Sequence, residues 1–353
     1  MNTFARTTST TSTTRGRAWA IWAALALAAA LVLVAALTLG SVPIPPRQAL
    51  GALFAPAGGD PLAGEIVRTL RLPRALAGFG CGALLALAGA LLQVLLRNPL
   101  AEPYVLGVSG GAAGFALAAM IAGAAWWWVD AASFAGALLS VALVLGLAHR
   151  SLRLGPARGT VRDTVREASP RLLLTGVVVA AGWGALITLM LSIAPDSRLR
   201  GMVFWLAGDL GSAAPPWFAL AALACALLAA LPVAPQLNVL LRGELGAAAL
   251  GVPVARLRVR LYLIASLAAA ASVTTAGTIG FIGLVVPHGL RLAFGNDQRM
   301  LLPAAALAGG TAVMAADLVA RTVIAPAQLP VGAMTALIGV PVFLWMLLRG
   351  PGR

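Results

Sequence analysis

The chain has 353 residues, of which 60% are hydrophobic and only 10% are charged, and its mean hydropathy is +0.94. A soluble domain has roughly a quarter of its residues charged, so this composition excludes a soluble globular fold. All 25 basic residues are arginine. Without lysine the chain can form neither a Walker A phosphate loop nor a lysine Schiff base, so any ATP must be handled by a partner.

Apolar segments recur along the whole chain. A helix of about 20 apolar residues crosses a hydrocarbon core of about 30 Å, so the pattern predicts an all-α integral membrane protein. The turn between the seventh and eighth segments is placed at Gly277–Gly280, which keeps the later loops on consistent sides. The ten predicted spans are 19–40, 74–96, 104–125, 131–149, 171–193, 213–234, 258–276, 278–294, 301–320 and 331–348.

The arginines orient these spans. The segment 1–18 precedes an apolar run of at least 20 residues, which is longer than the apolar region of a signal peptide, so we expect an uncleaved cytoplasmic tail followed by one permease domain over 19–348 and a second cytoplasmic tail, 349–353. This topology satisfies the positive-inside bias, and it makes the net charge of +14 a topology signal rather than a sign of nucleic-acid binding. The arginines that it places outside are Arg47, Arg68, Arg71, Arg74, Arg198, Arg200 and Arg321.

Three connections differ in character. Segment 41–70 contains five prolines and is predicted to be a structured outside loop. Segment 150–170 is predicted to be a basic, polar cytoplasmic loop. Segment 235–257 has glycines around short helix-forming stretches, so we expect one or two short helices at the cytoplasmic surface, where they could take up motion from a partner.

Two groups of motifs resemble a known family. The resemblance runs from about residue 65 to the C-terminus, and it is to the FecCD-type permeases of importers for ferric siderophores, haem and vitamin B12. The sequence departs from the family pattern at Glu102, where Asp is commoner, at Thr278, where Pro is usual, and at Gln328, where Glu is usual. The motifs are Arg71-Leu-Pro-Arg74, Gly89-Ala-Leu-Leu-Gln93, Arg97-Asn-Pro-Leu-Ala-Glu-Pro103, Leu106-Gly-Val-Ser-Gly-Gly111, Gly277-Thr-Ile-Gly-Phe-Ile-Gly-Leu-Val-Val-Pro-His288, Leu329-Pro-Val-Gly332 and Gly339-Val-Pro-Val-Phe343.

The resemblance implies a type II ABC importer permease fold in the bacterial inner membrane. It implies a homodimer with the pathway at the two-fold interface, two ATP-binding cassette subunits on the cytoplasmic side and a periplasmic substrate-binding protein outside. ATP and Mg²⁺ would be bound by the cassette subunits, so we expect no cofactor on this chain. Its other surroundings would be membrane lipid. The cargo would be a ferric siderophore, haem or cobalamin.

For docking of the binding protein, the resemblance indicates Arg71, Arg74 and Arg321. All three are outside in the predicted topology. Arginine makes bidentate contacts with carboxylates and stays charged, which suits a reversible contact between proteins. The alternative is that these arginines are structural and cap the carbonyl groups of helix ends.

For coupling to the ATPase, the resemblance indicates the loop within 235–257. A short helix seated in a cleft of the ATPase would move with it as a rigid body. The alternative is an ordinary interfacial loop. The residues indicated are Asn238, Arg242, Gly243, Glu244, Ala249, Leu250, Gly251 and Val252.

For the pathway, the resemblance indicates the fifth and tenth spans. Both are almost entirely apolar, and their polar side chains include Thr175, Thr188, Ser192 and Thr335. A lining with few anchoring groups suits release of a bulky cargo. The alternative for each hydroxyl is a hydrogen bond to its own helix backbone.

No pattern of catalytic or metal-binding residues emerges. His149 and His288 are far apart, and Cys81 and Cys225 both lie in apolar runs, where we interpret them as packing residues. A membrane enzyme is therefore disfavoured. A secondary transporter driven by an ion gradient stays open as the main alternative, and it would need buried ionisable groups within the spans. Asp209 and Asp317 are the acids closest to span interiors.

Overall fold

A computed structural model describes residues 15–54, 61–147, 161–211 and 215–349. All regular structure in this part of the chain is helical, as the composition predicts. A π-helical stretch, Ile66–Arg71, precedes α4, and a 3₁₀ turn, Pro103–Leu106, precedes α5. The α-helices are α1 (Arg15–Thr38), α2 (Pro46–Phe54), α3 (Pro61–Glu65), α4 (Leu72–Leu95), α5 (Val108–Ile121), α6 (Trp126–Leu147), α8 (Val161–Ile193), α9 (Asp196–Leu206), α10 (Pro216–Ala230), α11 (Ala234–Leu240), α12 (Glu244–Ala249), α13 (Val254–Ala276), α14 (Ile282–Phe294), α15 (Gln298–Thr322) and α16 (Val331–Arg349).

Each of the ten predicted spans coincides with a helix. Eight helices of the described chain are long and apolar enough to cross a membrane, whereas α5 and α14 are shorter. The prediction of a full span over 104–125 is therefore wrong in length, since the 14 residues of α5 rise only about 21 Å. The reason is local: Gly107 has a φ of 75°, which separates α5 from the 3₁₀ turn before it.

Two predicted loops are partly helical. Segment 41–70 contains α2, α3 and most of the π-helical stretch, so its interpretation as a loop without helix is wrong. Pro46 and Pro61 are the first residues of α2 and α3, where the missing N–H breaks no hydrogen bond. Helix α8 begins ten residues before the predicted span and includes the end of segment 150–170. The predicted short helices in 235–257 are confirmed as α11 and α12.

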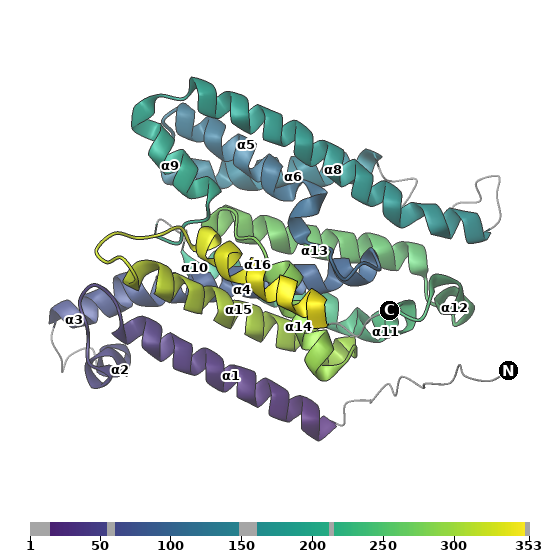
Figure 1. The fold of residues 1–353 in the computed structure, drawn as a ribbon, viewed down its shortest axis with the longest axis horizontal. Helices are drawn as coiled ribbons and strands as arrows, with labels where there is room; N and C mark the ends of the chain where they lie inside the picture. Colours follow the sequence, from purple (N-terminus) through teal and green to yellow (C-terminus); the bar gives the residue numbers. More distant parts are fainter. Residues whose placement is uncertain (1–14, 55–60, 148–160, 212–214, 350–353) are drawn as a thin grey trace.

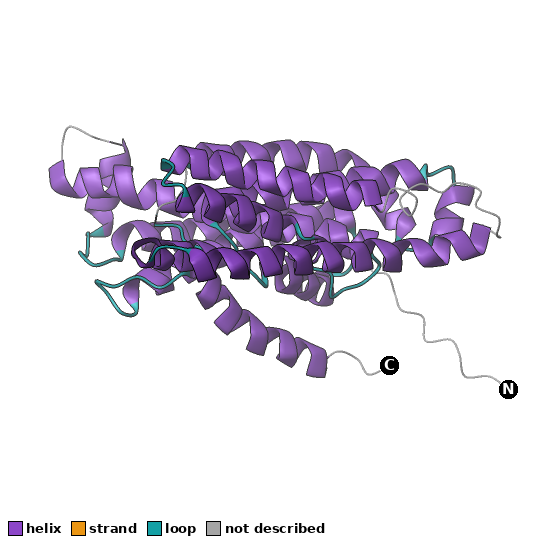
Figure 2. Ribbon diagram, turned by 90° about the horizontal axis from the view of Figure 1, so that it is seen from above, coloured by secondary structure: helices purple, strands orange, loops and turns teal. Residues whose placement is uncertain are grey.

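The helices form an elongated bundle, with different short helices at its two ends. Figure 1 shows α2, α3 and α9 at one end, and α11, α12, the start of α1 and the end of α16 at the other. The elements that carry the seven arginines predicted to be outside meet at the first end. Figure 2 shows that α16 leaves the bundle at an angle.

Helix α4 lies at the centre of the bundle, where it packs against α10, α13, α14 and α15. In the most apolar stretch of the helical segment ending at Leu95, 89% of residues are buried, against 11% in the stretch Leu172–Ile193 of α8. Helix α4 is thus enclosed by its own chain. Helix α8 instead presents most of its surface to lipid or to another protein.

Glycines allow the close packing of other helices around α4. A Cβ atom placed on Gly82 would lie 2.2 Å from the carbonyl oxygen of Gly309 in α15. A Cβ atom on Gly89 would lie 1.9 Å from the carbonyl oxygen of Gly283 in α14. Small residues of this kind let membrane helices approach with their backbones in contact.

We expect Gly89→Ala to lower the stability of the bundle. The added methyl group would clash with a backbone carbonyl that cannot rotate away, and overpacking costs about 1–3 kcal/mol or more. Gly146→Ala in α6 is the matched control, because nothing lies within 4 Å of a Cβ atom there. Thermal unfolding of both detergent-solubilised variants tests this. Equal midpoints would show that α4 and α14 can separate without loss of stability.

The turn between α13 and α14 is held from a distant loop. The N–H of Phe281 donates to Glu102 Oε1 at 2.8 Å, and the N–H of Ile279 donates to the Tyr104 hydroxyl at 3.0 Å. Burial raises the pKa of Glu102, and the hydrogen bond from Phe281 lowers it. The predicted turn at 277–280 is confirmed, and the family motif around Glu102 has a structural explanation.

A buried side chain satisfies the backbone carbonyl that Pro287 leaves without a donor in α14. Pro287 has no N–H to donate to the carbonyl of Gly283, four residues earlier. The side-chain amide of Gln93 in α4 donates to the carbonyls of Gly283 at 3.4 Å and Leu284 at 3.2 Å. Arg291 in turn donates to the Gln93 side-chain oxygen. This contact satisfies polar groups that lipid could not.

Candidate functional site

Three arginines indicated by the sequence gather at the end of the bundle that contains α2 and α3, which is the end predicted to be outside. Arg74 Nη2 lies 2.8 Å from Asp317 Oδ1, and Arg74 Nε lies 3.0 Å from the same oxygen. Arg74 Nη1 donates to Gln328 Oε1 at 2.7 Å. Arg321 Nε lies 3.8 Å from Asp317 Oδ2. Asp317 is therefore the shared counter-charge of α4 and α15.

Arg71 and Arg321 also hold the end of α1. Arg71 Nη1 donates to the carbonyls of Leu37 at 2.8 Å and Thr38 at 3.0 Å, and Arg321 donates to the carbonyl of Ala36. The last carbonyls of a helix have no partners within the helix, so these guanidinium groups cap it. This geometry matches the structural alternative for both residues.

A cavity of about 220 Å³ opens where these arginines meet. Three guanidinium groups line it, and the carboxylate of Asp317 is the counter-charge beside them. The cavity is therefore cationic and suits a partner's carboxylates. Its lining consists of Gly40, Ser41, Val42, Ile66, Leu70, Arg71, Arg74, Arg321 and Gln328.

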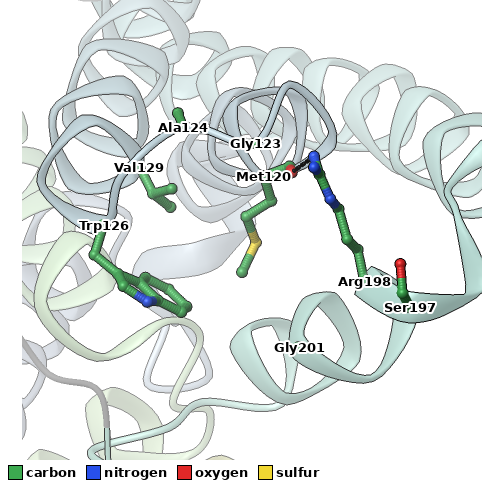
Figure 3. A pocket seen from close by; sticks show the side chains of 8 residues that line it. All are labelled: Met120, Gly123, Ala124, Trp126, Val129, Ser197, Arg198 and Gly201. Atoms are coloured by element: carbon green, nitrogen blue, oxygen red, sulfur yellow. Dashed lines mark hydrogen bonds between the residues drawn. The ribbon is translucent and has the colours of Figure 1, made fainter.

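A second hollow, of about 270 Å³, lies between α9 and the turn from α5 to α6. Figure 3 shows Trp126 and Arg198 on opposite sides of it, with Met120 between them. Arg198 Nη1 donates to the carbonyl of Met120 at 2.6 Å and to that of Ile121, so it caps α5. Trp126–Trp128 are each more than half exposed, and their role as an interfacial aromatic belt stays a prediction.

Glycines join the outer ends of α9, α13 and α16. A Cβ atom on Gly277 would lie 2.1 Å from the carbonyl oxygen of Trp205, and one on Gly332 would lie 2.3 Å from that of Ala207. The Thr278 hydroxyl donates to the carbonyl of Leu206. The departure from the family pattern at position 278 thus provides a further bond in this junction.

The predicted coupling residues divide into buried and exposed groups. Asn238 faces inward: its amide nitrogen donates to Asp297 Oδ1 at 2.7 Å, and its oxygen accepts from the N–H of Gln298 at 2.8 Å. Glu244 is also buried. Arg242, Leu250 and Gly251 are exposed, and Gly243 is partly buried.

Sequence reasoning missed Leu245 in this group. Its side chain is 49% exposed, and that of Leu250 is 74% exposed. Glu244 and Ala247, three residues apart, form the buried face of α12. That spacing was the available signal, since it leaves Leu245 on the opposite face. The two leucines give α12 an apolar surface outside the bundle.

Three of the four predicted pathway hydroxyls donate hydrogen bonds to the backbone of their own helices. Thr188 donates to the carbonyl of Gly184 at 2.9 Å, Ser192 to that of Thr188 at 2.9 Å and Thr335 to that of Gly332 at 2.9 Å. This matches the backbone alternative. Thr188 and Ser192 are exposed on α8, whereas Thr335 is buried and Thr175 is partly buried.

Within the described part of the chain, His288 and the two cysteines give no sign of metal binding. His288 lies beside Phe343 with ring centroids 6.4 Å apart, and His149 lies outside the described residues. Cys81 is buried, and Cys225 is exposed rather than packed inside, so the interpretation of Cys225 as a packing residue within this chain is wrong. Among the described residues, no group of three or more His, Cys, Asp or Glu could hold a metal ion.

Comparison with known proteins agrees with this architecture. The model of the FecCD transport family matches residues 27–349. The vitamin B12 import system permease protein BtuC of Klebsiella pneumoniae is 37% identical over 347 residues, covering 96% of both chains. The protein of that name from Vibrio vulnificus is 40% identical over 286 residues, covering 81% of this chain and 83% of its own.

A solved structure gives the same result for the fold. A protein described as a metal-chelate type ABC transporter in an inward-facing conformation has a TM-score of 0.80 with 28% identity, covering 94% of this chain and 99% of its own. The all-helical type II importer fold is therefore confirmed. The chain belongs to the FecCD transport family and is the membrane permease of an ABC importer, in which a partner subunit hydrolyses the ATP.

Proposed function

We propose that this permease imports a bulky metal chelate, with cobalamin as the first candidate. The similarity to vitamin B12 permeases over most of the chain supports cobalamin, and the similarity to a metal-chelate transporter supports the broader class. Ferric siderophores and haem are the competing cargoes. The nearly apolar surfaces of α8 and α16 suit a cargo that is recognised elsewhere and only passes through.

The arrangement of α4 supports this proposal most strongly. Arg74 lies at the outer start of α4 and Arg97 lies just beyond its inner end. The 23 steps from Arg74 to Arg97 rise about 35 Å, which is enough to cross a hydrocarbon core of about 30 Å. One enclosed helix thus connects the cationic cavity with the region of α12.

The binding protein would dock over the cationic cavity. Its carboxylates would face Arg71, Arg74 and Arg321, and Arg74 is the one whose side chain reaches Gln328 at the exposed rim. Charge complementarity of this kind steers association and sets orientation. Two ATPase subunits would bind at the opposite end, against the exposed face of α12.

A second copy of the chain would complete the pathway in the bacterial inner membrane. Helices α8 and α16 present large exposed apolar side chains, and obligate dimer interfaces are apolar in this way. Lipid would cover the remaining apolar faces. With ten crossings, and with the arginine distribution predicted from the sequence, both termini would lie in the cytoplasm. The exposed apolar residues include Leu174, Val178, Leu186, Leu189 and Ile193 on α8, and Leu337, Ile338, Leu344, Leu347 and Leu348 on α16.

Competitive uptake identifies the cargo. The permease is reconstituted in proteoliposomes with the ATPase and the binding protein of the same organism, and cyanocobalamin, ferrichrome and haemin are offered separately and together. We expect ATP-dependent uptake of labelled cyanocobalamin that the other two do not inhibit. If only ferrichrome or only haemin is taken up, that compound and not cobalamin is the cargo. Uptake of none of them would contradict the proposed class.

A further inference from the structure

An ion-pair triad of two buried residues, Glu244 and Arg258, and the exposed Arg97 joins three elements at the end of the bundle that contains α12. Glu244 is the first residue of α12, and its carboxylate binds Arg258 in α13 and Arg97 just after α4. The Arg97 Nη2 to Glu244 Oε1 distance is 3.1 Å. The side chains of Glu244 and Arg258 are each 3% exposed. Glu244 therefore points into the bundle and away from any partner bound to α12.

The backbone at Arg97 is also adapted to this contact. Its φ of 49° lies in the left-handed region, which residues other than glycine seldom adopt. The chain turns there immediately after α4, and the arginine side chain reaches α12. Such conformations persist where surrounding structure holds them and often accompany function.

Stability alone does not explain this triad. Replacing a buried ion pair by apolar residues of similar volume is often neutral or stabilising, because desolvation offsets the attraction between the charges. Within the described residues, Glu244 Oε2 and Arg258 Nη1 are buried without a hydrogen-bond partner. The pair is thus only partly satisfied. The triad does link α12 directly to α13 and to the end of α4.

We propose that Glu244 is a positioning residue that locks α12 to α4 and α13. Movement of α12 by the ATPase would then move both helices together, and each helix runs to the outer end of the bundle, where α4 carries Arg74 and α13 meets α9 through Gly277. The inference rests on the proposed contact between α12 and the ATPase. It assigns Glu244 to transmission rather than to that contact.

Glu244→Gln tests the lock in the reconstituted complex of permease, ATPase and binding protein. Glutamine keeps the shape but removes the charge. We expect the ATPase to stay bound and active while uptake of the transported chelate falls roughly tenfold, within the range of typical coupling energies. The number of ATP molecules hydrolysed per chelate imported then rises by the same factor. Arg256→Gln, an exposed arginine in the first turn of α13, is the control and should leave this ratio unchanged.

A double variant separates the effect of the Glu244–Arg258 pair on coupling from its effect on stability. In Glu244→Leu with Arg258→Met, apolar packing replaces the buried pair, so we expect the unfolding midpoint to match that of the unaltered protein. Under the proposal this variant stays uncoupled, with a raised ATP-to-chelate ratio. Recovery of both midpoint and ratio would overturn the proposal and make the triad merely structural. An unchanged ratio in Glu244→Gln would also overturn it.

The surface variant Leu250→Arg tests the proposed ATPase contact at α12 separately from the proposed positioning role of Glu244. If it leaves ATPase binding intact, the proposed site on α12 is wrong and the inference fails with it. If it removes ATPase binding while Glu244→Gln leaves the ratio unchanged, the proposed site stands and only the inference fails.

Discussion

Asp317→Asn is expected to destabilise the permease by about 3–5 kcal/mol, the usual cost of removing one partner of a buried ion pair. The carboxylate is 4% exposed, accepts two hydrogen bonds from Arg74 Nε and Nη2, and faces Arg321. Asparagine keeps the shape and one acceptor oxygen but no charge. Two guanidinium groups would then lie in a region of low dielectric without their shared counter-charge.

Thermal unfolding in detergent, followed by the loss of the monodisperse chromatographic peak, measures this effect. Asp196→Asn is the control, because Asp196 is exposed in the first turn of α9 and surface changes stay within about 0.5 kcal/mol. An unchanged midpoint for Asp317→Asn would mean that the carboxylate does not hold the arginines in place. The cationic cavity would then lack its organising residue.

Leu250→Arg is expected to detach the ATPase and to reduce ATP-dependent uptake by at least about 30-fold. Leu250 follows α12 directly and is 74% exposed, so it contributes little packing to the core of the bundle. Truncation or charging of a central apolar contact at an interface costs roughly 2 kcal/mol or more, which corresponds to that factor in affinity. The measurement is the ratio of ATPase to permease after co-purification, together with uptake.

Leu250→Met is the matched control, since it keeps an apolar side chain of similar volume and should retain most ATPase binding. The unfolding midpoint of the isolated Leu250→Arg permease should not change, because an exposed position loses little packing. ATPase recovered with Leu250→Arg in the same ratio as with the unaltered protein would show that α12 is not the docking helix.

The sequence predicted the elements better than their contacts. Each span predicted from hydropathy overlaps a helix, because hydropathy is a local signal, whereas the approach of Gly89 to Gly283 follows from tertiary packing. The prolines of 41–70 were interpreted as breakers, although Pro46 and Pro61 each begin a helix, where proline is favoured. The length of α5 depended on one left-handed glycine, whose φ the sequence does not reveal.

The sequence indicated which residues form the candidate site, but not which groups their side chains contact. The arginines predicted to be outside lie on elements that meet at one end of the bundle, yet the partners of Arg71 are carbonyls more than thirty residues away in α1. Glu244 matched a coupling motif, but its burial depends on Arg97, which precedes it by 147 residues. Such partners follow from tertiary packing, so hydropathy and motif spacing could not separate positioning residues from contact residues.

Uptake by the purified chain, alone and in the full complex, tests the central claim most directly. Proteoliposomes would contain either the permease only or the permease with its ATPase and binding protein, and each would be assayed with ATP inside, without ATP, and under a proton or sodium gradient. We predict chelate uptake only in the full complex and only with ATP. Uptake by the permease alone under an ion gradient would contradict the importer account and indicate a secondary transporter.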